Sequence, residues 1–191
     1  MILGKRHLKK ILVKNNRLFR FIKAGGIIIY PTESSFGIGC DPSNIRAIRK
    51  IIALKKRDIN KNFIIITSSI NNASKYIEQL SKENLKKVNK KWPGAHTWLL
   101  KSNNNCPGWL KKNNKIALRI PDFQPCQILC SFLGMAIIST SANLSGKKSL
   151  TKYREVSRLF YKKSKIIKGR IGEARKPSKI QDFQTGKILR S

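Results

Sequence analysis

Two polar segments of the sequence combine hydroxyl groups with glycine, a composition typical of loops that bind phosphate. The first is residues 31–39 (PTESSFGIG), which follows the apolar run 27–30. The second is residues 139–146 (STSANLSG), which follows the apolar run 135–138. Backbone N–H groups and hydroxyls in such loops donate to phosphate oxygens. Ordinary hydrophilic turns share this composition, so either segment alone leaves both interpretations open.

Neither segment carries a standard nucleotide-binding fingerprint. Gly37 and Gly39 begin the dinucleotide pattern GxGxxG, but Pro42 stands where the third glycine belongs. Around Gly146 the phosphate-loop pattern fails as well, because Ser141 replaces its first glycine and one extra residue intervenes. We therefore exclude an ordinary Rossmann or P-loop protein.

A basic triplet, Lys55-Lys56-Arg57, ends the helix that is predicted after the first polar segment. Lysine would offer an anion a point charge and arginine a bidentate fork, although cations are also favoured at any helix C-terminus. The chain has only two histidines, His7 and His96, and nine acidic residues, so acid-base and nucleophilic catalysis have few candidates. Any chemistry should therefore rest on cations and N–H dipoles that position anions, as in phosphoryl and nucleotidyl transfer.

The elements that must position these residues alternate between apolar strands and amphipathic helices. Residues 8–24 have the spacing of a helix that Gly25-Gly26 ends, and Ser43 or Asn44 is expected to cap a helix that runs to about residue 54. This alternation predicts an α/β fold. The absence of repeats and linkers predicts a single domain over residues 1–191. Further strands are predicted at 27–30, 63–67, 97–100, 116–120, 135–139, 166–167, 180–183 and 188–189, and further helices at 71–91, 125–133 and 154–161.

The charge of the chain limits its partners. Forty-one Lys and Arg against 9 Asp and Glu give a net charge of +32, which favours nucleic acid, nucleotides or an anionic membrane. The chain also has 29 Lys to 12 Arg and 27 Ile to 3 Val, a bias that an AT-rich genome would impose. Selected polyanion binding and compositional drift therefore both stay open.

The remaining composition bears on the compartment of the protein. The hydrophobic content of 40% is enough for a packed core. No apolar run is as long as a membrane span, and no apolar region follows the basic N-terminus, so neither a membrane anchor nor a signal peptide is expected. Four cysteines lack metal-ligand spacing, so we expect reduced thiols and no metal held by the protein. Together these features predict a cytoplasmic protein.

Several short motifs occur in a fixed order along the chain: Tyr30-Pro31-Thr32-Glu33, 36–41 (FGIGCD), 55–57 (KKR), 92–94 (WPG) with Thr97, 117–121 (ALRIP) and 139–146. In this order and spacing the sequence resembles the YrdC/TsaC family, the threonylcarbamoyl-AMP synthases. The resemblance runs from about residue 8 to residue 191 and fits the short single-domain form of the family. It implies a twisted mixed α/β sheet that is flanked by helices and has a basic concave cleft.

The resemblance implies a reaction in which L-threonine, bicarbonate (or CO₂) and ATP give threonylcarbamoyl-AMP and pyrophosphate. A separate tRNA-modifying transferase complex would use the product to make threonylcarbamoyladenosine beside the anticodon of tRNA. ATP would be a substrate, and Mg²⁺ would be held mainly by its phosphates and water. The alternative is a non-catalytic RNA-binding module that acts on structured RNA; the charge supports it, but no RNP or KH motif occurs. Direct binding to tRNA or other RNA is left open.

The same resemblance suggests roles for residues at matching positions. Lys55 and Arg57 should hold the triphosphate or carbamate and stabilise developing charge. Thr32 should help to bind threonine, and Arg119 is the candidate for its carboxylate. The nucleotide and carbamate pocket should be lined by Ser139, Ser141 and Asn143, and weaker matches are Thr97, Ser178 and Arg190.

The sequence departs from the family pattern at three places. Asp58 stands where the family usually has proline after its Lys-x-Arg motif, and residues 61–63 (KNF) replace a Lys-Pro-Leu-like stretch. Ala95 replaces the second proline of Pro-Gly-Pro-x-Thr. Asp58 puts a negative charge beside the basic triplet, so we expect it to weaken triphosphate affinity. The central motifs survive, and we expect activity to be retained.

Overall fold

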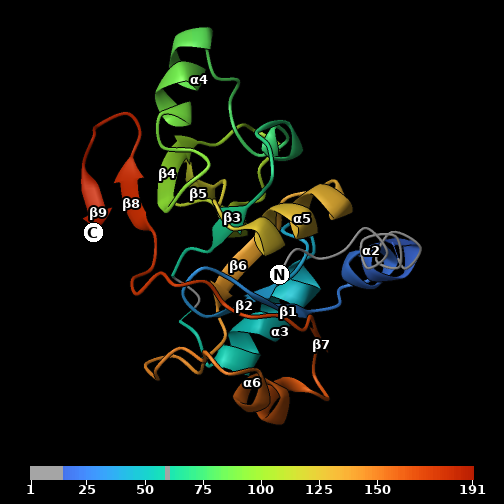
Figure 1. Ribbon diagram of the computed structural model, residues 1–191. Helices are drawn as coiled ribbons and strands as arrows, with labels where there is room; N and C mark the ends of the chain where they lie inside the picture. Colours follow the sequence, from blue (N-terminus) through green and yellow to red (C-terminus); the bar gives the residue numbers. More distant parts are fainter. Residues whose placement is uncertain (1–14, 59–60) are drawn as a thin grey trace.

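The computed structural model describes residues 15–58 and 61–191, which form a nine-stranded sheet with helices on both faces (Figure 1). The strands are β1 (Ile28–Pro31), β2 (Phe36–Gly39), β3 (Ile64–Ile66), β4 (His96–Lys101), β5 (Lys115–Arg119), β6 (Ile137–Ser141), β7 (Lys165–Ile166), β8 (Lys179–Asp182) and β9 (Ile188–Arg190). The helices are α2 (Asn15–Lys23), α3 (Ile45–Lys55), α4 (Lys82–Asn89), α5 (Gln124–Leu133) and α6 (Tyr153–Phe160), with 3₁₀ turns η1 (Asn71–Ala73) and η2 (Gly108–Leu110).

The strand order is β7-β1-β2-β6-β3-β5-β4-β8-β9, and neighbouring strands pair in both directions. For example, β3 is parallel to β5 and antiparallel to β6. The predicted α/β fold with a mixed sheet flanked by helices is therefore confirmed. No helix among the described residues is long and apolar enough to cross a membrane.

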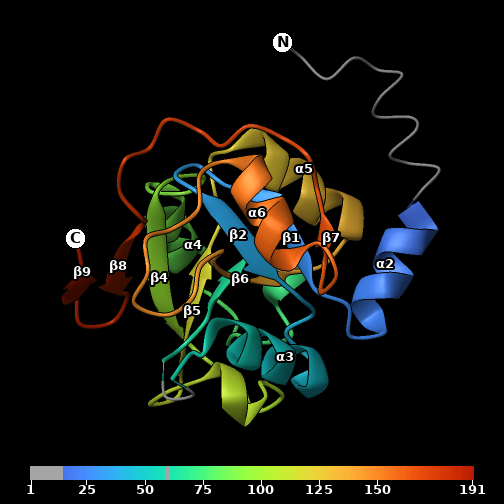
Figure 2. The same ribbon diagram turned by 90° about the horizontal axis from the view of Figure 1, so that it is seen from below.

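Two hydrophobic clusters cover the two faces of the sheet. Alternate residues of β1 separate them: Ile29 packs in the cluster that contains α3 and α6, whereas Ile28 and Tyr30 pack in the cluster that contains α2 and α5. Figure 2 shows α3 and α5 on opposite sides of the central strands. Because side chains alternate along a strand, a strand covered on both faces is apolar throughout, and this explains the uninterrupted run at 27–30.

Helix α3 places Lys55, the first residue of the basic triplet, at the carboxyl end of the central strand β6. Of the two predicted caps, Ser43 and Asn44, it is Asn44 that caps its N-terminus: the Asn44 side chain accepts a hydrogen bond from the Ala47 N–H at 3.1 Å. At the other end Lys56 adopts the left-handed conformation, with φ 48° and ψ 46°. This residue ends the helix and separates Lys55, the last helical residue, from Arg57.

We predict that Lys56→Gly stabilises the protein. The left-handed conformation costs a non-glycine residue roughly 1 kcal/mol, and glycine relieves this strain. Glycine also loses more backbone entropy on folding, which offsets about half of the relieved energy. The free energy of unfolding should therefore rise by about 0.5 kcal/mol, seen as a higher urea midpoint at unchanged m. Arg49→Gly, at an exposed interior position of the same helix, should instead lower it by about 1 kcal/mol. Equal losses in both variants would contradict the prediction.

Two predicted boundaries around the polar segments are wrong. Residues 36–39, expected within a polar loop, form β2, which pairs antiparallel with β1 and with the end of β6. The close approach of β6 requires glycine here, because a Cβ on Gly39 would lie 2.6 Å from the Ile138 carbonyl oxygen. Strand β6 begins at Ile137 rather than at residue 135 and runs to Ser141, so the second polar loop starts later than expected.

The predicted helix over residues 71–91 is also largely wrong. The segment contains only η1 and α4, with extended chain between them that makes a bridge from Ile77 to Ser102. Ser81 caps α4 by accepting a hydrogen bond from the Asn84 N–H at 3.1 Å, so the local capping signal limits the helix to its second half. The helix predicted over residues 8–24 is observed as α2 from residue 15, and residues 8–14 lie outside the described residues.

Candidate functional site

The register of the sheet places several predicted site residues on one face. Ser139 pairs with Ile64, Ile64 with Ala117, and Ala117 with Leu99. Because every second residue of a strand faces the same way, these pairings set a common face for alternate residues of β6, β5 and β4. The predicted residues on that face are Ser139, Ser141, Arg119 and Thr97, and it is the face against which α5 packs.

Lys55 is buried, with 2% of its surface exposed, and its ammonium lies against the turn that follows β6. Its Nζ donates to the Ser141 carbonyl, to the Asn143 carbonyl at 2.7 Å and to Asn143 Oδ1 at 3.0 Å. In return the Lys55 carbonyl accepts from the Ser145 N–H at 2.7 Å. Burial, with a smaller effect of the nearby Arg57 charge, lowers the pKa of Lys55 to about 8. The side chain is thus a buried cation at neutral pH, and it joins α3 to the second polar segment.

The side chain of Asn143 completes this turn. Its Oδ1 accepts from Ser141 Oγ at 2.6 Å, and its Nδ2 donates to the Lys147 carbonyl. Three of the predicted residues, Lys55, Ser141 and Asn143, are therefore in direct contact. Ser139, two residues earlier on β6, lies beside the hydroxyl of Tyr30, whose pKa burial raises.

Arg57 is held by a different segment. Its Nη2 donates to the Asn62 carbonyl at 2.8 Å and to the Lys61 carbonyl at 3.3 Å, and its guanidinium carbon lies 4.8 Å from the centre of the Phe63 ring. Burial lowers the pKa of Arg57, and the Asp58 charge opposes that shift. Asp58 therefore favours the charged form of Arg57. The residues that replace the family's Lys-Pro-Leu-like stretch are the ones that hold this arginine.

Arg119 makes a largely buried ion pair that the sequence analysis missed. Its Nη2 contacts Glu33 Oε1, and the two side chains are only 12% and 16% exposed. Its Nε donates to the Gly94 carbonyl at 2.9 Å. Glu33 belongs to the motif at 30–33, from which the sequence predicts a substrate-binding role for Thr32 alone. Thr32 shapes the β1–β2 hairpin, because its Oγ1 donates to the Ser35 carbonyl at 2.7 Å.

The three remaining predicted residues form one hydrogen-bonded group. The hydroxyls of Thr97 and Ser178 are 2.8 Å apart and buried. Arg190 donates from Nε to the Ser178 carbonyl at 2.9 Å and from Nη2 to Ser178 Oγ at 3.1 Å. Burial, followed by the charge of Arg119, lowers the pKa of Arg190. The Arg119 and Arg190 charges are thus close enough to interact.

The β1–β2 hairpin connects the two groups of residues. Gly37 of β2 pairs with Ser141, and the Phe36 carbonyl accepts from the Ala142 N–H at 2.7 Å, so the hairpin borders the turn that holds Lys55. At its tip, Glu33 reaches Arg119. The hairpin therefore borders the Lys55 turn along β2 and contacts Arg119 at its tip.

The chemistry of this arrangement is the binding of anions. Its cations outnumber its carboxylates: Glu33 is paired with Arg119, and Asp58 follows Arg57 and favours the charged form of that arginine. Among the described residues no group of three or more His, Cys, Asp or Glu side chains could hold a metal ion. This donor set does not fit a protein cage for a divalent cation. The site can orient oxyanions and neutralise negative charge that develops on them.

Comparison with known proteins gives relatives of nearly full length. A family model described as "Telomere recombination" (Sua5/YciO/YrdC) matches residues 20–191. A protein of Methylobacillus flagellatus named threonylcarbamoyl-AMP synthase is 40% identical over 174 residues, 91% of this chain and 97% of the relative. A protein of Wigglesworthia glossinidia brevipalpis with the same name is 41% identical over 177 residues, 91% of both chains.

Solved structures share the fold. P. abyssi Sua5 complexed with L-threonine superimposes with a TM-score of 0.79 at 26% identity, over 90% of this chain. The match covers 51% of the Sua5 chain, so this protein spans about half the length of that relative. E. coli YciO superimposes with a TM-score of 0.79 at 24% identity, over 94% of this chain and 89% of YciO, a likeness that shows the fold alone.

Proposed function

Because the chain belongs to the Sua5/YciO/YrdC family, we propose that it is a threonylcarbamoyl-AMP synthase, the activity for which its bacterial relatives are named. It would convert L-threonine, bicarbonate or CO₂, and ATP to threonylcarbamoyl-AMP and pyrophosphate. The main support is that the buried Lys55 ammonium donates hydrogen bonds to the Ser141 and Asn143 carbonyls in a site that is rich in cations and hydroxyls. Such a site suits a reaction in which both reacting groups are anions.

The reaction has two bond-forming steps. The amine nitrogen of threonine forms a bond to the carbon of CO₂ or bicarbonate and loses a proton, which gives a carbamate. When bicarbonate is the source, its hydroxyl group takes that proton and leaves as water. A carbamate oxygen then attacks the α-phosphorus of ATP in line, the bond from that phosphorus to the bridging oxygen breaks, and pyrophosphate leaves. Both partners of the second step are negatively charged, so the protein must hold them together and neutralise their repulsion.

The residues are assigned to the substrates by charge and position. Arg57 would bind the triphosphate and carbamate, and the buried Lys55, whose three N–H groups donate to the turn after β6, would neutralise their charge through that turn. Ser139, Ser141 and Asn143 would lie beside the nucleotide. Arg119 binds the threonine carboxylate next to Thr32, and Glu33 and Gly94 fix the plane of its guanidinium. The Thr97–Ser178–Arg190 group supports the same end of the site. These groups would line a basic concave cleft.

We propose that the enzyme also depends on a metal ion and on a downstream transferase. Mg²⁺ would enter with ATP, bound mainly by its phosphates and water, since the chain offers few carboxylates. Residues 1–191 would act as one domain in the cytoplasm. A tRNA-modifying transferase complex would take the product and transfer it to the adenosine beside the anticodon.

Pyrophosphate release tests the proposal. Release should require ATP, threonine and bicarbonate together, and omission of any one should reduce it to background. Serine, which lacks only the methyl group of threonine, serves as the matched substrate control and should support slower release. Release by folded protein that is independent of threonine would contradict the proposal.

The lowered pKa of Lys55 predicts how ATP binding depends on pH. An ordinary lysine keeps its charge up to about pH 10.4, whereas Lys55 in the free protein begins to lose its charge near pH 8. ATP affinity, measured by titration calorimetry without threonine, should therefore weaken as the pH rises above about 8. In Lys55→Ala the affinity should be lower at every pH and flat across this range. The same pH dependence in both proteins would show that another group is responsible.

A further inference from the structure

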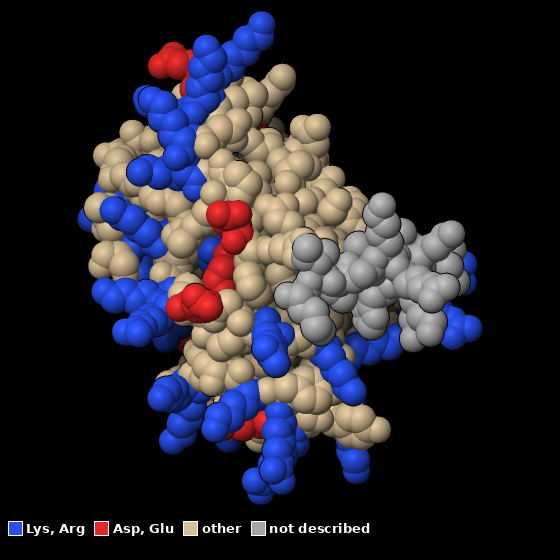
Figure 3. Space-filling view, in the orientation of Figure 1, with Lys and Arg blue, Asp and Glu red and all other residues tan. Residues whose placement is uncertain are grey.

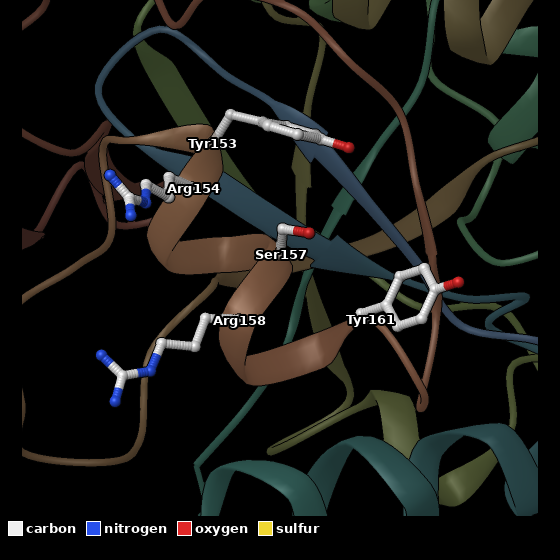
Figure 4. A pocket seen from close by; sticks show the side chains of 5 residues that line it. All are labelled: Tyr153, Arg154, Ser157, Arg158 and Tyr161. Atoms are coloured by element: carbon white, nitrogen blue, oxygen red, sulfur yellow. The ribbon is translucent and has the colours of Figure 1, made fainter.

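Helix α6 presents an aromatic and basic surface outside the proposed active site. Tyr153, Ser157 and Tyr161 recur every four residues and so form one row along the helix, and Arg154 and Arg158 form the adjacent row. Together the five residues line a shallow hollow of about 410 Å³ (Figure 4). Val156 and Phe160 anchor the helix in the cluster on the α3 face of the sheet. The hollow therefore lies on the opposite side of the sheet from Arg119 and Ser139.

The side chains of this surface divide by chemistry. Figure 4 shows the two tyrosine rings and the Ser157 hydroxyl pointing to one side, and the two guanidinium groups pointing to the other. Tyr161 is 74% exposed, which is unusual for an aromatic residue, and Arg154 and Arg158 are exposed as well. None of the four ion pairs among the described residues uses either arginine.

The surroundings of α6 are strongly basic. Residues 147–170 contain ten Lys and Arg and a single acidic residue, Glu155, a higher ratio than in the whole chain. Figure 3 shows Lys and Arg side chains gathered around α6 at the bottom of the view. Lys168 lies over the Tyr153 ring, with its Nζ 5.8 Å from the ring centre. Positive charge therefore surrounds the tyrosines, and this favours a polyanion as the partner.

From this arrangement we infer that the α6 surface binds single-stranded RNA. Unstacked bases stack on tyrosine rings, and phosphates bind arginine forks. Tyr161, which is 74% exposed, offers its ring to a base. The half-buried Tyr153 ring packs against the core with Lys168 over it and borders the same strand about two helical turns away. The arginine row beside them can follow the sugar-phosphate backbone. The hydroxyls of Tyr153, Ser157 and Tyr161 offer partners for the ribose 2′-OH, which distinguishes RNA from DNA.

An anionic membrane fits this surface less well. Helices that lie in a membrane interface bury a broad apolar face, whereas the hollow on α6 is lined by hydroxyl-bearing and charged side chains. The exposed apolar residue of the helix, Leu159, lies outside the row that forms the hollow. An exposed tyrosine ring with two exposed guanidinium groups beside it matches a base and the phosphates of one strand.

Binding of a fluorescently labelled single-stranded RNA of about 12 nucleotides, followed by anisotropy, tests this inference in the full-length chain. Tyr161→Ala should weaken binding about tenfold, because it removes one stacking platform, whereas Tyr161→Phe should retain most of the affinity. The matched control Leu189→Ala, at an exposed apolar residue of β9, should bind as wild type does. Circular dichroism and threonine-dependent pyrophosphate release should be unchanged in all three variants.

Charge is tested separately through the dependence on salt. Arg154→Ala/Arg158→Ala should reduce the slope of log K against log salt by about 1.4, the contribution of two phosphates on a single strand. The control Lys82→Ala/Lys86→Ala has the same spacing on α4, at the other end of the molecule (Figure 1), and should leave the slope unchanged.

Four results would overturn the inference. The first is unchanged RNA affinity in Tyr161→Ala, and the second is an equal loss of slope in the α4 control. The third is equal affinity of the wild-type protein for DNA of the same sequence. The fourth is that Tyr161→Ala still binds RNA but no longer binds phosphatidylserine–phosphatidylcholine vesicles. The second result would show that RNA is attracted by the overall positive charge rather than by α6. The fourth would show that the α6 surface binds a membrane.

Discussion

Lys55→Ala is expected to lower threonine-dependent pyrophosphate release by at least about 100-fold, the effect of removing one preorganised group that stabilises developing charge. The loss corresponds to about 2.7 kcal/mol of transition-state stabilisation. Lys55 is expected to matter this much because it is a buried cation fixed by three oxygens of the turn that carries Ser141 and Asn143. Steady-state kinetics at saturating ATP and threonine measure the effect.

The same substitution also removes a donor from three oxygens of the turn, among them the buried Asn143 carbonyl, so its effect on folding must be separated from its effect on chemistry. An unsatisfied buried acceptor costs roughly 1–3 kcal/mol, and the melting temperature of Lys55→Ala should fall accordingly. Lys50→Ala, on the same helix, removes one ammonium that donates to the Gly25 carbonyl at 3.1 Å and should retain wild-type turnover. Near-normal turnover in a folded Lys55→Ala would reduce this residue to a structural support.

Arg119→Ala is expected to raise the KM for threonine by about 100-fold or more while changing the KM for ATP only a few-fold. A hydrogen bond to a charged group contributes up to about 3 kcal/mol, and the guanidinium is fixed by Gly94 and Glu33 in one orientation. Arg119→Lys keeps the positive charge but cannot make the two parallel hydrogen bonds of a guanidinium to a carboxylate. Its KM for threonine should therefore lie between those of wild type and Arg119→Ala.

Removing Arg119 also leaves Glu33 without its partner in a largely buried pair, which destabilises a protein by up to a few kcal/mol. Glu33→Gln is the matched control, because it breaks the same ion pair and leaves the arginine in place. If Arg119 binds threonine, Glu33→Gln should keep a KM within a few-fold of wild type. If both variants lose threonine affinity equally, Arg119 acts only through the ion pair.

The sequence predicted well the parts of the fold that depend on local signals. The apolar run at 27–30 predicted a strand, observed as β1, and the polar pair Ser43 and Asn44 predicted the start of α3. It failed where tertiary packing outweighs local preference. The glycines of residues 36–39 suggested a loop, but they allow β6 to approach β2 closely. The lysine-rich stretch 71–91 looked helical throughout, although only its end is an α-helix.

The geometry of the candidate site could not be predicted from spacing. Lys55 and Asn143 are 88 residues apart in sequence, and Arg119 and Glu33 are 86 apart. No local pattern encodes such contacts; they follow from the strand order, in which β6 lies beside β2 and only β3 separates β6 from β5. Motif resemblance selected most of the residues that the fold brings together, but it left out Glu33, since a carboxylate has no evident role in binding anionic substrates.

The central claim, that threonine reaches the α-phosphorus of ATP as its carbamate, is tested most directly by the fate of bicarbonate carbon. The protein is incubated with ATP, threonine and [¹³C]bicarbonate, and the adenylate product is analysed by mass spectrometry. If the carbamate attacks ATP, the adenylate contains threonine, carries the labelled carbon and forms in step with pyrophosphate. An adenylate of threonine without the label would mean that the amino acid carboxylate itself attacks ATP and that no carbamate is formed.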